Sequence, residues 1–184
     1  GRITYNFEED IIASAKTICK RYKGNQAHAE YLEQMAGKFF DLLQKYHGLG
    51  ERERLLLRLA AILHDCGKFI SMSAPGECAY QIIMSTEILG ISHMEREMVA
   101  CIVRYNTMEL PNFREFDGKL GNDEYLIVMK LAAILRVCNA LDRSHRQKFA
   151  DMKLTIKDSN IVITTAYPDN ITLEKKTLKD KQDF

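Results

Sequence analysis

The chain has 184 residues, of which 46% are hydrophobic and 28% charged, and its formal net charge at pH 7 is +1. This length suits one domain, or one domain with a small appendage, and the hydrophobic share is enough to build a core. A net charge so close to zero excludes a global attraction to nucleic acid or to membrane surfaces, although local clusters can still act. No apolar run approaches the roughly 20 residues of a membrane-spanning helix.

The cysteine pattern and the N-terminus indicate where the chain works. No CxxC pair occurs, and each of the five cysteines lies in or beside an apolar helical pattern, at Cys19, Cys66, Cys78, Cys101 and Cys138. Buried free thiols are typical of a reducing compartment, and no signal-peptide pattern opens the chain. We therefore predict a cytoplasmic protein. The start at Gly1-Arg2 and the abrupt charged end suggest a piece excised from a longer chain.

Apolar residues at helical spacing predict six helices before residue 150. Ser92 and Glu95 form a capping box that opens the fifth helix, and a long polar loop with Pro and Gly separates it from the sixth. The predicted helices cover about 7–22, 25–47, 51–66, 77–89, 93–105 and 123–142.

The pattern changes after residue 151. Alternating apolar residues around a tight turn predict two strands, and residues 171–176 can add a third. The sequence thus predicts a mainly α fold, with a helical domain over 1–150 and a small β-hairpin or three-stranded appendage over 151–184.

One stretch places two potential metal ligands at the end of a buried helix. The apolar run 58–63 leads directly into His64 and Asp65, and Gly67 follows as a helix-ending residue. A buried His-Asp pair costs several kcal/mol unless it is hydrogen bonded or metal bound. His28 and Asp142 can supply further ligands from other helices, and such a mixed N/O set suits Mn, Fe, Co, Ni or Zn. The alternative is a hydrogen-bonded polar network without an ion.

These residues also carry a family resemblance. The order His28, then His64-Asp65, then Asp142 resembles the HD superfamily of helical metal-dependent phosphohydrolases. The resemblance to the HD-type domain in the C-terminal half of the Ppx/GppA phosphatases, the exopolyphosphatases and guanosine pentaphosphate phosphatases, covers most of the chain. It rests on His64-Asp65-x-Gly67-Lys68-Phe69-Ile70, Tyr80-x-Ile82-Ile83, Arg104-Tyr105, and Ile134-Leu135-Arg136 followed by Ala140-Leu141-Asp142-Arg143-Ser144-His145.

The resemblance implies an HD-type bundle of six or more helices and a single divalent metal ion, Mn, Fe, Ni, Co, Zn or Mg. Its ligands would be His28, His64, Asp65 and Asp142, and in an active site Asp65 and Lys68 would be catalytic. Lys68 can equally be a solvated cation beyond the helix. A second ion is disfavoured, because residues 76–78 replace a common histidine cluster and residue 106 is Asn where histidine is common.

Basic residues near Asp142 predict a phosphate-binding rim. Arginine forks match phosphate oxygens, so a polyanion could follow this surface. The predicted phosphate contacts are Arg104, Arg143, Arg146 and Lys148, with Arg136 and His145 beside them. The alternative is a solvated surface with local ion pairs.

Two functions remain in view. In the first, this is the HD-type domain of an exopolyphosphatase-like protein, which binds polyphosphate or a guanosine polyphosphate and regulates hydrolysis by N-terminal actin-like domains. The isolated chain would then be weakly active or inactive, since no Gly-rich phosphate loop is present. In the second, it is an autonomous metal-dependent phosphohydrolase acting on nucleotides or phosphoesters. Nucleic-acid binding is disfavoured because the basic cluster lacks interleaved aromatic residues. We expect no membrane partner. A homodimer is possible.

Overall fold

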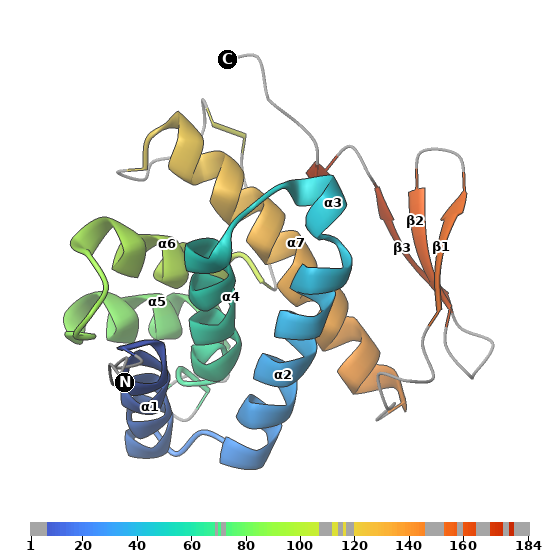
Figure 1. The fold of residues 1–184 in the computed structure, drawn as a ribbon. Helices are drawn as coiled ribbons and strands as arrows, with labels where there is room; N and C mark the ends of the chain where they lie inside the picture. Colours follow the sequence, from blue (N-terminus) through green and yellow to red (C-terminus); the bar gives the residue numbers. More distant parts are fainter. Residues whose placement is uncertain are drawn as a thin grey trace, which may run out of the picture.

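The computed structural model describes residues 7–68, 70, 73–106, 112–113, 116, 120–145, 153–157, 160–164, 170–174 and 177–178. Within these residues seven helices precede three short strands, so the prediction of a mainly α fold is confirmed (Figure 1). The helices are α1 (Phe7–Arg21), α2 (Gln26–Leu42), α3 (Gln44–His47), α4 (Glu51–Leu63), α5 (Pro75–Ser85), α6 (His93–Arg104) and α7 (Asn122–His145). None of the helices in this part of the chain has the length and hydropathy to cross a bilayer.

Helix α4 is the centre of the bundle. It packs against α1, α2, α6 and α7, and in Figure 1 it lies in the middle of the helices. Glu51 and Glu53 in its first turn interact favourably with the positive end of the helix dipole. The run from Leu55 to Leu63 is almost entirely buried. Because α4 is surrounded, the residues that follow its last turn necessarily emerge among several neighbouring helices.

The predicted capping box of α6 is confirmed and is tied to α4. The Ser92 hydroxyl accepts from the Glu95 backbone N–H, and the Glu95 carboxylate accepts from the Ser92 backbone N–H. Arg52 of α4 donates through Nε and Nη2 to the same carboxylate at 2.6 and 2.9 Å, and also to the Gly90 carbonyl. This bidentate pair fixes the turn between α5 and α6 against the central helix.

Three of the predicted helices have different bounds in the structure. The predicted helix 25–47 is divided at Leu43, whose φ and ψ of −95° and 3° are not helical, and α3 follows. The predicted helix 51–66 ends at Leu63, because the Cys66 N–H bonds to the Leu63 carbonyl and tightens the chain into a turn. The predicted helix 77–89 begins two residues earlier and ends at Ser85, since Thr86 is extended.

The strands follow α7. β1 (Lys153–Lys157), β2 (Asn160–Thr164) and β3 (Asn170–Glu174) pair antiparallel in the order β1-β2-β3. Ile161, Ile163 and Leu173 are buried within the main core cluster, and β3 contacts α7. One face of the strands therefore packs against the helices. The proposed domain boundary near residue 150 stays a prediction.

Gly67 allows a close approach beside the His64-Asp65 turn. A Cβ atom on Gly67 would lie 2.2 Å from the Pro75 carbonyl oxygen and 2.6 Å from the Ala79 backbone nitrogen. Both neighbours are backbone atoms of α5 and cannot rotate away. The missing side chain thus lets the start of α5 pack directly on the turn that carries His64 and Asp65.

His47, by contrast, is a structural histidine. It is 4% exposed, its Nε2 is 2.8 Å from the Phe40 carbonyl oxygen, and its Nδ1 accepts from the Leu49 backbone N–H at 2.9 Å. Since a carbonyl only accepts, Nε2 carries the proton and the ring is neutral. Burial lowers the pKa of His47 below its ordinary 6.5, against the opposing effect of the Phe40 hydrogen bond.

Substitution of Gly67 by Ala is expected to lower the free energy of unfolding by about 1–3 kcal/mol, because the added methyl overpacks a rigid contact. Thermal unfolding measures the loss. Gly50→Ala is the matched control, since its methyl would meet nothing nearer than 3.6 Å. Equal losses in both variants would contradict the close-approach argument.

His47 should make stability depend on pH. The unfolded state takes up a proton near pH 6.5 while the folded state resists it, so stability is complete above that pH and falls as the pH drops below it. The loss levels off once folded His47 is protonated. Urea unfolding at pH 7.5 and 5.5 should show a smaller pH difference in His47→Gln than in the wild type, and an unchanged difference would refute this assignment.

Candidate functional site

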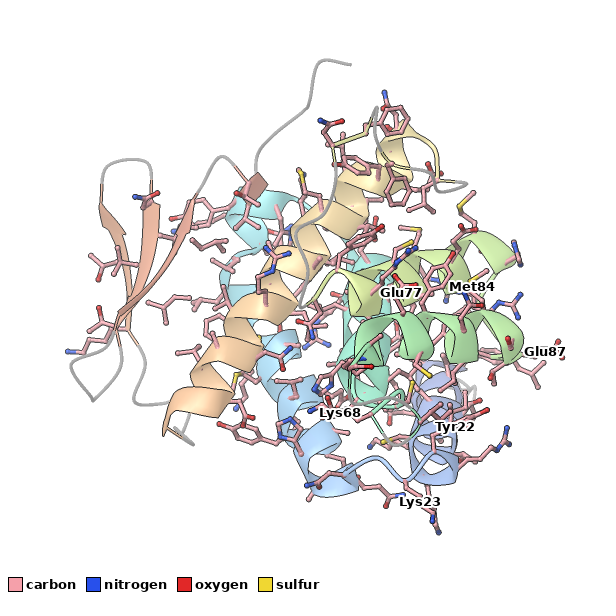
Figure 2. The ribbon with its side chains drawn as sticks, turned by 180° about the vertical axis from the view of Figure 1, so that it is seen from behind. Tyr22, Lys23, Lys68, Glu77, Met84 and Glu87 are labelled. Atoms are coloured by element: carbon pink, nitrogen blue, oxygen red, sulfur yellow. The ribbon has the colours of Figure 1, made fainter. Side chains whose placement is uncertain are left out.

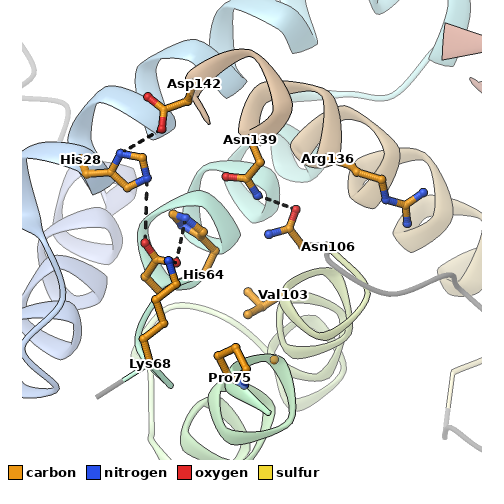
Figure 3. A pocket seen from close by; sticks show the side chains of 11 residues that line it. His28, His64, Lys68, Pro75, Val103, Asn106, Arg136, Asn139 and Asp142 are labelled. Atoms are coloured by element: carbon orange, nitrogen blue, oxygen red, sulfur yellow. Dashed lines mark hydrogen bonds and ion pairs between the residues drawn. The ribbon is translucent and has the colours of Figure 1, made fainter. Parts of the chain in front are cut away.

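A pocket of about 380 Å³ opens at the end of α4 (Figure 3). Its walls come from α2, the turn after α4, the start of α5, the end of α6 and one face of α7. The lining residues are His28, His64, Asp65, Lys68, Pro75, Gly76, Val103, Asn106, Arg136, Asn139 and Asp142. Five of the residues predicted from sequence therefore meet in one place: His28, His64, Asp65, Lys68 and Asp142.

The Asp65 carboxylate is the centre of this group. Its Oδ1 lies 2.9 Å from Lys68 Nζ and 3.2 Å from His64 Nε2, and its Oδ2 lies 3.9 Å from His28 Nε2. The side chain of Asp65 is 17% exposed and that of His64 is 6% exposed. One largely buried carboxylate thus faces two imidazoles and one ammonium group.

Hydrogen bonds on the far sides of both rings fix which nitrogen faces Asp65. His64 Nδ1 lies 2.6 Å from the Ala61 carbonyl oxygen, which can only accept, so Nδ1 carries a proton. His28 Nδ1 lies 3.3 Å from Asp142 Oδ2, where the ring is again the only donor. In the neutral rings both Nε2 atoms therefore direct a lone pair toward Asp65. Two ring nitrogens and one carboxylate are thus directed at one another, as the ligands of a shared metal ion are.

The donor set fits a metal ion. His28, His64 and Asp65 each offer one ligand atom, and these atoms all lie within 4.8 Å of one another. Two imidazole nitrogens and one carboxylate oxygen suit a divalent transition metal, with open positions left for water or a ligand oxygen. The three residues form a candidate metal centre.

Asp142 lies behind His28. Its carboxylate contacts Nδ1, the ring nitrogen opposite to the one that faces Asp65. A carboxylate in this position holds a metal-binding histidine in one tautomer and orientation. The sequence predicted Asp142 as a direct ligand, and that role stays a prediction beside the contact to His28.

The electrostatics of Asp65 agree with its contacts. Burial alone raises the pKa of its carboxyl, but the hydrogen bonds and charges of His64 and Lys68 outweigh that effect and bring the pKa well below its ordinary value. Asp65 is therefore ionised throughout the neutral range and always available as a ligand.

One face of α7 extends the pocket. Arg136, Asn139 and Asp142 follow one another at intervals of three residues and all line it. Arg136 Nη2 donates to the Tyr105 carbonyl at 2.9 Å, and Asn139 Nδ2 donates to Asn106 Oδ1 at 2.7 Å. Sequence reasoning did not propose Asn106 or Asn139 as site residues. Asn139 could have been predicted, because it lies three residues before Asp142 and therefore on the same face of the helix.

Arg104, one of the predicted phosphate-binding residues, lies outside the pocket that holds the predicted metal ligands. Arg104 does not line the pocket: it pairs with Glu77 of α5 and lies over the Tyr80 and Tyr105 rings at 5.0 and 5.4 Å. Figure 2 shows Glu77 among the side chains of α5 and α6, apart from Lys68.

The remaining predicted phosphate contacts lie at and beyond the end of α7. Arg143 belongs to α7, but the position of its side chain is not described, and Arg146 and Lys148 lie outside the described residues. Their role in binding a polyanion stays a prediction.

Comparison with known families agrees with this geometry. Residues 12–182 match the family described as Ppx/GppA phosphatase, domain III. The chain belongs to the Ppx/GppA phosphatase family. As domain III it is one part of a multidomain phosphatase, so the resemblance found in the sequence is confirmed. A comparison of the chain with curated proteins gave no match.

The two carboxylates of this domain III should differ in their effect on metal affinity. Asp65→Ala removes a ligand atom and is expected to abolish Mn²⁺ binding, whereas Asp142→Ala only releases His28 and should weaken it roughly 10–100-fold. Isothermal titration of the metal-free chain measures both. Equal loss in the two variants would instead show Asp142 to be a direct ligand, as the sequence predicted.

Proposed function

We propose that this domain supplies a metal-dependent phosphate-binding pocket to its parent phosphatase. The ligand would be an end of polyphosphate or of a guanosine polyphosphate, held while actin-like domains elsewhere in the parent chain hydrolyse the phosphoanhydride. The supporting observation is the meeting of His28, His64, Asp65 and Asp142 with two cations in one open pocket.

The charge of the pocket explains why an ion and an anion would bind together. With neutral histidines, the carboxylates of Asp65 and Asp142 offset the positive charges of Lys68 and Arg136. A divalent ion would bring the lining to about +2, and at short range such a charge attracts phosphate oxygens strongly. Phosphate binding should therefore depend on the ion.

In this proposal the metal ligands and Lys68 have different roles. His28, His64 and Asp65 hold the ion, and Asp142 orients His28. When bound, the ion supplies positive charge to a phosphoryl oxygen. Lys68 is 56% exposed at its side chain, so its ammonium can leave Asp65 and contact a phosphate without moving the backbone.

The site belongs to the HD type in this view, with one ion and no second metal position. Among the described lining residues, Gly76 and Asn106 stand where further histidines would be needed. Arg143, Arg146 and Lys148 would extend the cationic surface for a longer polyanion, and Arg104 would contribute only after leaving Glu77.

The second candidate is an autonomous phosphohydrolase. It is favoured by the open side of the His28, His64 and Asp65 cluster, because a catalytic metal site leaves a coordination position for water or substrate. In that case Asp65 and Lys68 would be the catalytic residues, and the chain would release phosphate without any other domain.

Titration of the purified chain with short-chain polyphosphate tests the proposal. Binding is expected to be at least about tenfold tighter with Mn²⁺ than with a chelator, and Asp65→Asn should remove the difference because it removes the ion. Lys68→Gln should weaken binding with the ion present. Asp123→Asn makes the same chemical change on the exposed first turn of α7 and should bind as the wild type does.

Phosphate release measured on the same samples separates the two candidates. No release from polyphosphate or nucleotides, together with ion-dependent binding, supports the binding role. Turnover that Asp65→Asn abolishes would establish the autonomous enzyme instead. Wild-type binding that is equal with Mn²⁺ and with chelator would overturn the proposal.

A further inference from the structure

Asn106 is a buried polar residue whose side-chain amide lies in the pocket wall. It lies just beyond α6 and is 4% exposed, yet it lines the pocket. Its Oδ1 accepts from Asn139 Nδ2 at 2.7 Å. Among the residues that the structure describes, no acceptor is found for its Nδ2, which carries two N–H groups. Because Asn106 lines the pocket, this amide group can donate to water or to a ligand that enters it.

The hydrogen bond between Asn139 and Asn106 determines which side-chain group of each residue faces the pocket. Asn139 is the donor and Asn106 the acceptor, so the NH₂ group of Asn106 is left over on the far side of the pair. Figure 3 shows that group directed into the space between the Asn pair and His64, with the Asn139 carbonyl toward Asp142. The pocket therefore has a donor at the Asn106 position and an acceptor at the Asn139 position.

The segment that carries Asn106 is held in place from two sides. The Asn106 backbone N–H bonds to the Val103 carbonyl at 3.4 Å, and Arg136 donates to the carbonyl of the preceding Tyr105. Arg136 and Asn139 are one helical turn apart on α7, so one face of that helix fixes both the backbone and the side chain. A donor held in this way loses little entropy when a ligand arrives.

The donor stands opposite the metal-binding side of the pocket. Asn139 and Asp142 are separated by about 4.5 Å along the axis of α7, from a rise of 1.5 Å per residue. Asn106 lines the same pocket as His28, His64 and Asp65, so it offers a donor to an oxyanion bound in that pocket.

We propose that Asn106 is a ligand-recognition residue whose Nδ2 donates to a phosphoryl oxygen of the bound phosphate. This assignment rests on the proposed function, since it takes the same pocket and the same class of ligand. Asn106 adds a directional hydrogen bond without adding charge, which the cations of the pocket cannot provide. The other reading is a purely structural amide pair that only joins α6 to α7.

Asn106→Asp removes the donor and keeps the amide pair, and the amide signals of the wild type then separate the two readings. The carboxylate keeps the acceptor that Asn139 needs, so the pair and the fold persist, but it replaces the donor with an acceptor and a negative charge. The affinity for inorganic phosphate and short-chain polyphosphate should fall roughly tenfold or more, while the unfolding temperature is unchanged or higher. Asn139→Asp places two acceptors against each other and should lower the unfolding temperature instead.

The control is Asn122→Asp, which puts the same charge change on the opposite, exposed end of α7. It should bind phosphate as the wild type does. Each variant is titrated both with Mn²⁺ and with chelator, because a new carboxylate could itself attract an ion. A loss in Asn106→Asp under both conditions, with no loss in the control, supports the assignment.

A measurement on the wild type removes any dependence on how the variant folds. The side-chain amide signals of Asn106 in a ¹⁵N-¹H spectrum should shift on addition of inorganic phosphate, while those of Asn122 stay in place. Unmoved Asn106 signals at saturating phosphate, or unchanged affinity in Asn106→Asp, would overturn this inference and leave the proposed function standing. Failure of the wild type to bind phosphate or polyphosphate at all would overturn both.

Discussion

The whole site depends on one carboxylate, that of Asp65. Three elements converge on it: His28 from α2, His64 and Lys68 from the turn after α4, and α7 indirectly through the contact of Asp142 with His28. Removing that negative charge would leave His64 and Lys68 without the carboxylate that both of them face, and only Asp142, beside His28, would remain as a counter-charge. The surrounding fold is built to keep the carboxylate there. Buried Leu residues fix α4, and the absence of a side chain at Gly67 lets α5 close against the turn.

Much of this could be predicted from the sequence, because the signals were local. The apolar stripes gave the positions of the helices, and the capping box at Ser92 fixed the start of α6. The convergence of His28, His64 and Asp65 could be predicted only because the separated motifs occur together in a known family; spacing alone does not bring α2 to the end of α4. The helix ends at Leu43 and Ser85 were missed, since apolar periodicity continued beyond the point where the backbone turns.

The part of the site that the sequence did not reveal is held by tertiary contacts between polar side chains. Asn106 and Asn139 are 33 residues apart, and nothing in either local sequence marks them as partners. Arg104 shows the converse. It was expected beside the basic residues near Asp142, and in the structure its guanidinium pairs with Glu77 of the neighbouring helix, so its phosphate contact stays a prediction. For charged and amide groups, the partner that folding supplies determines the role, and sequence position does not.

The openness of the candidate centre determines what sort of ion site it can be. A structural site closes four protein ligands around its ion, whereas in the described part of the chain three ligand atoms lie within reach of one another and Asp142 contacts the far side of His28. An ion held by three protein atoms needs further ligands, and a phosphate oxygen can be one of them. Binding of the two is then reciprocal: whatever factor the ion adds to phosphate affinity, phosphate must add to ion affinity. In a multidomain phosphatase that reciprocity would let this domain hold its ion firmly only while a phosphate chain is present, so occupancy of the pocket would report substrate to the rest of the protein.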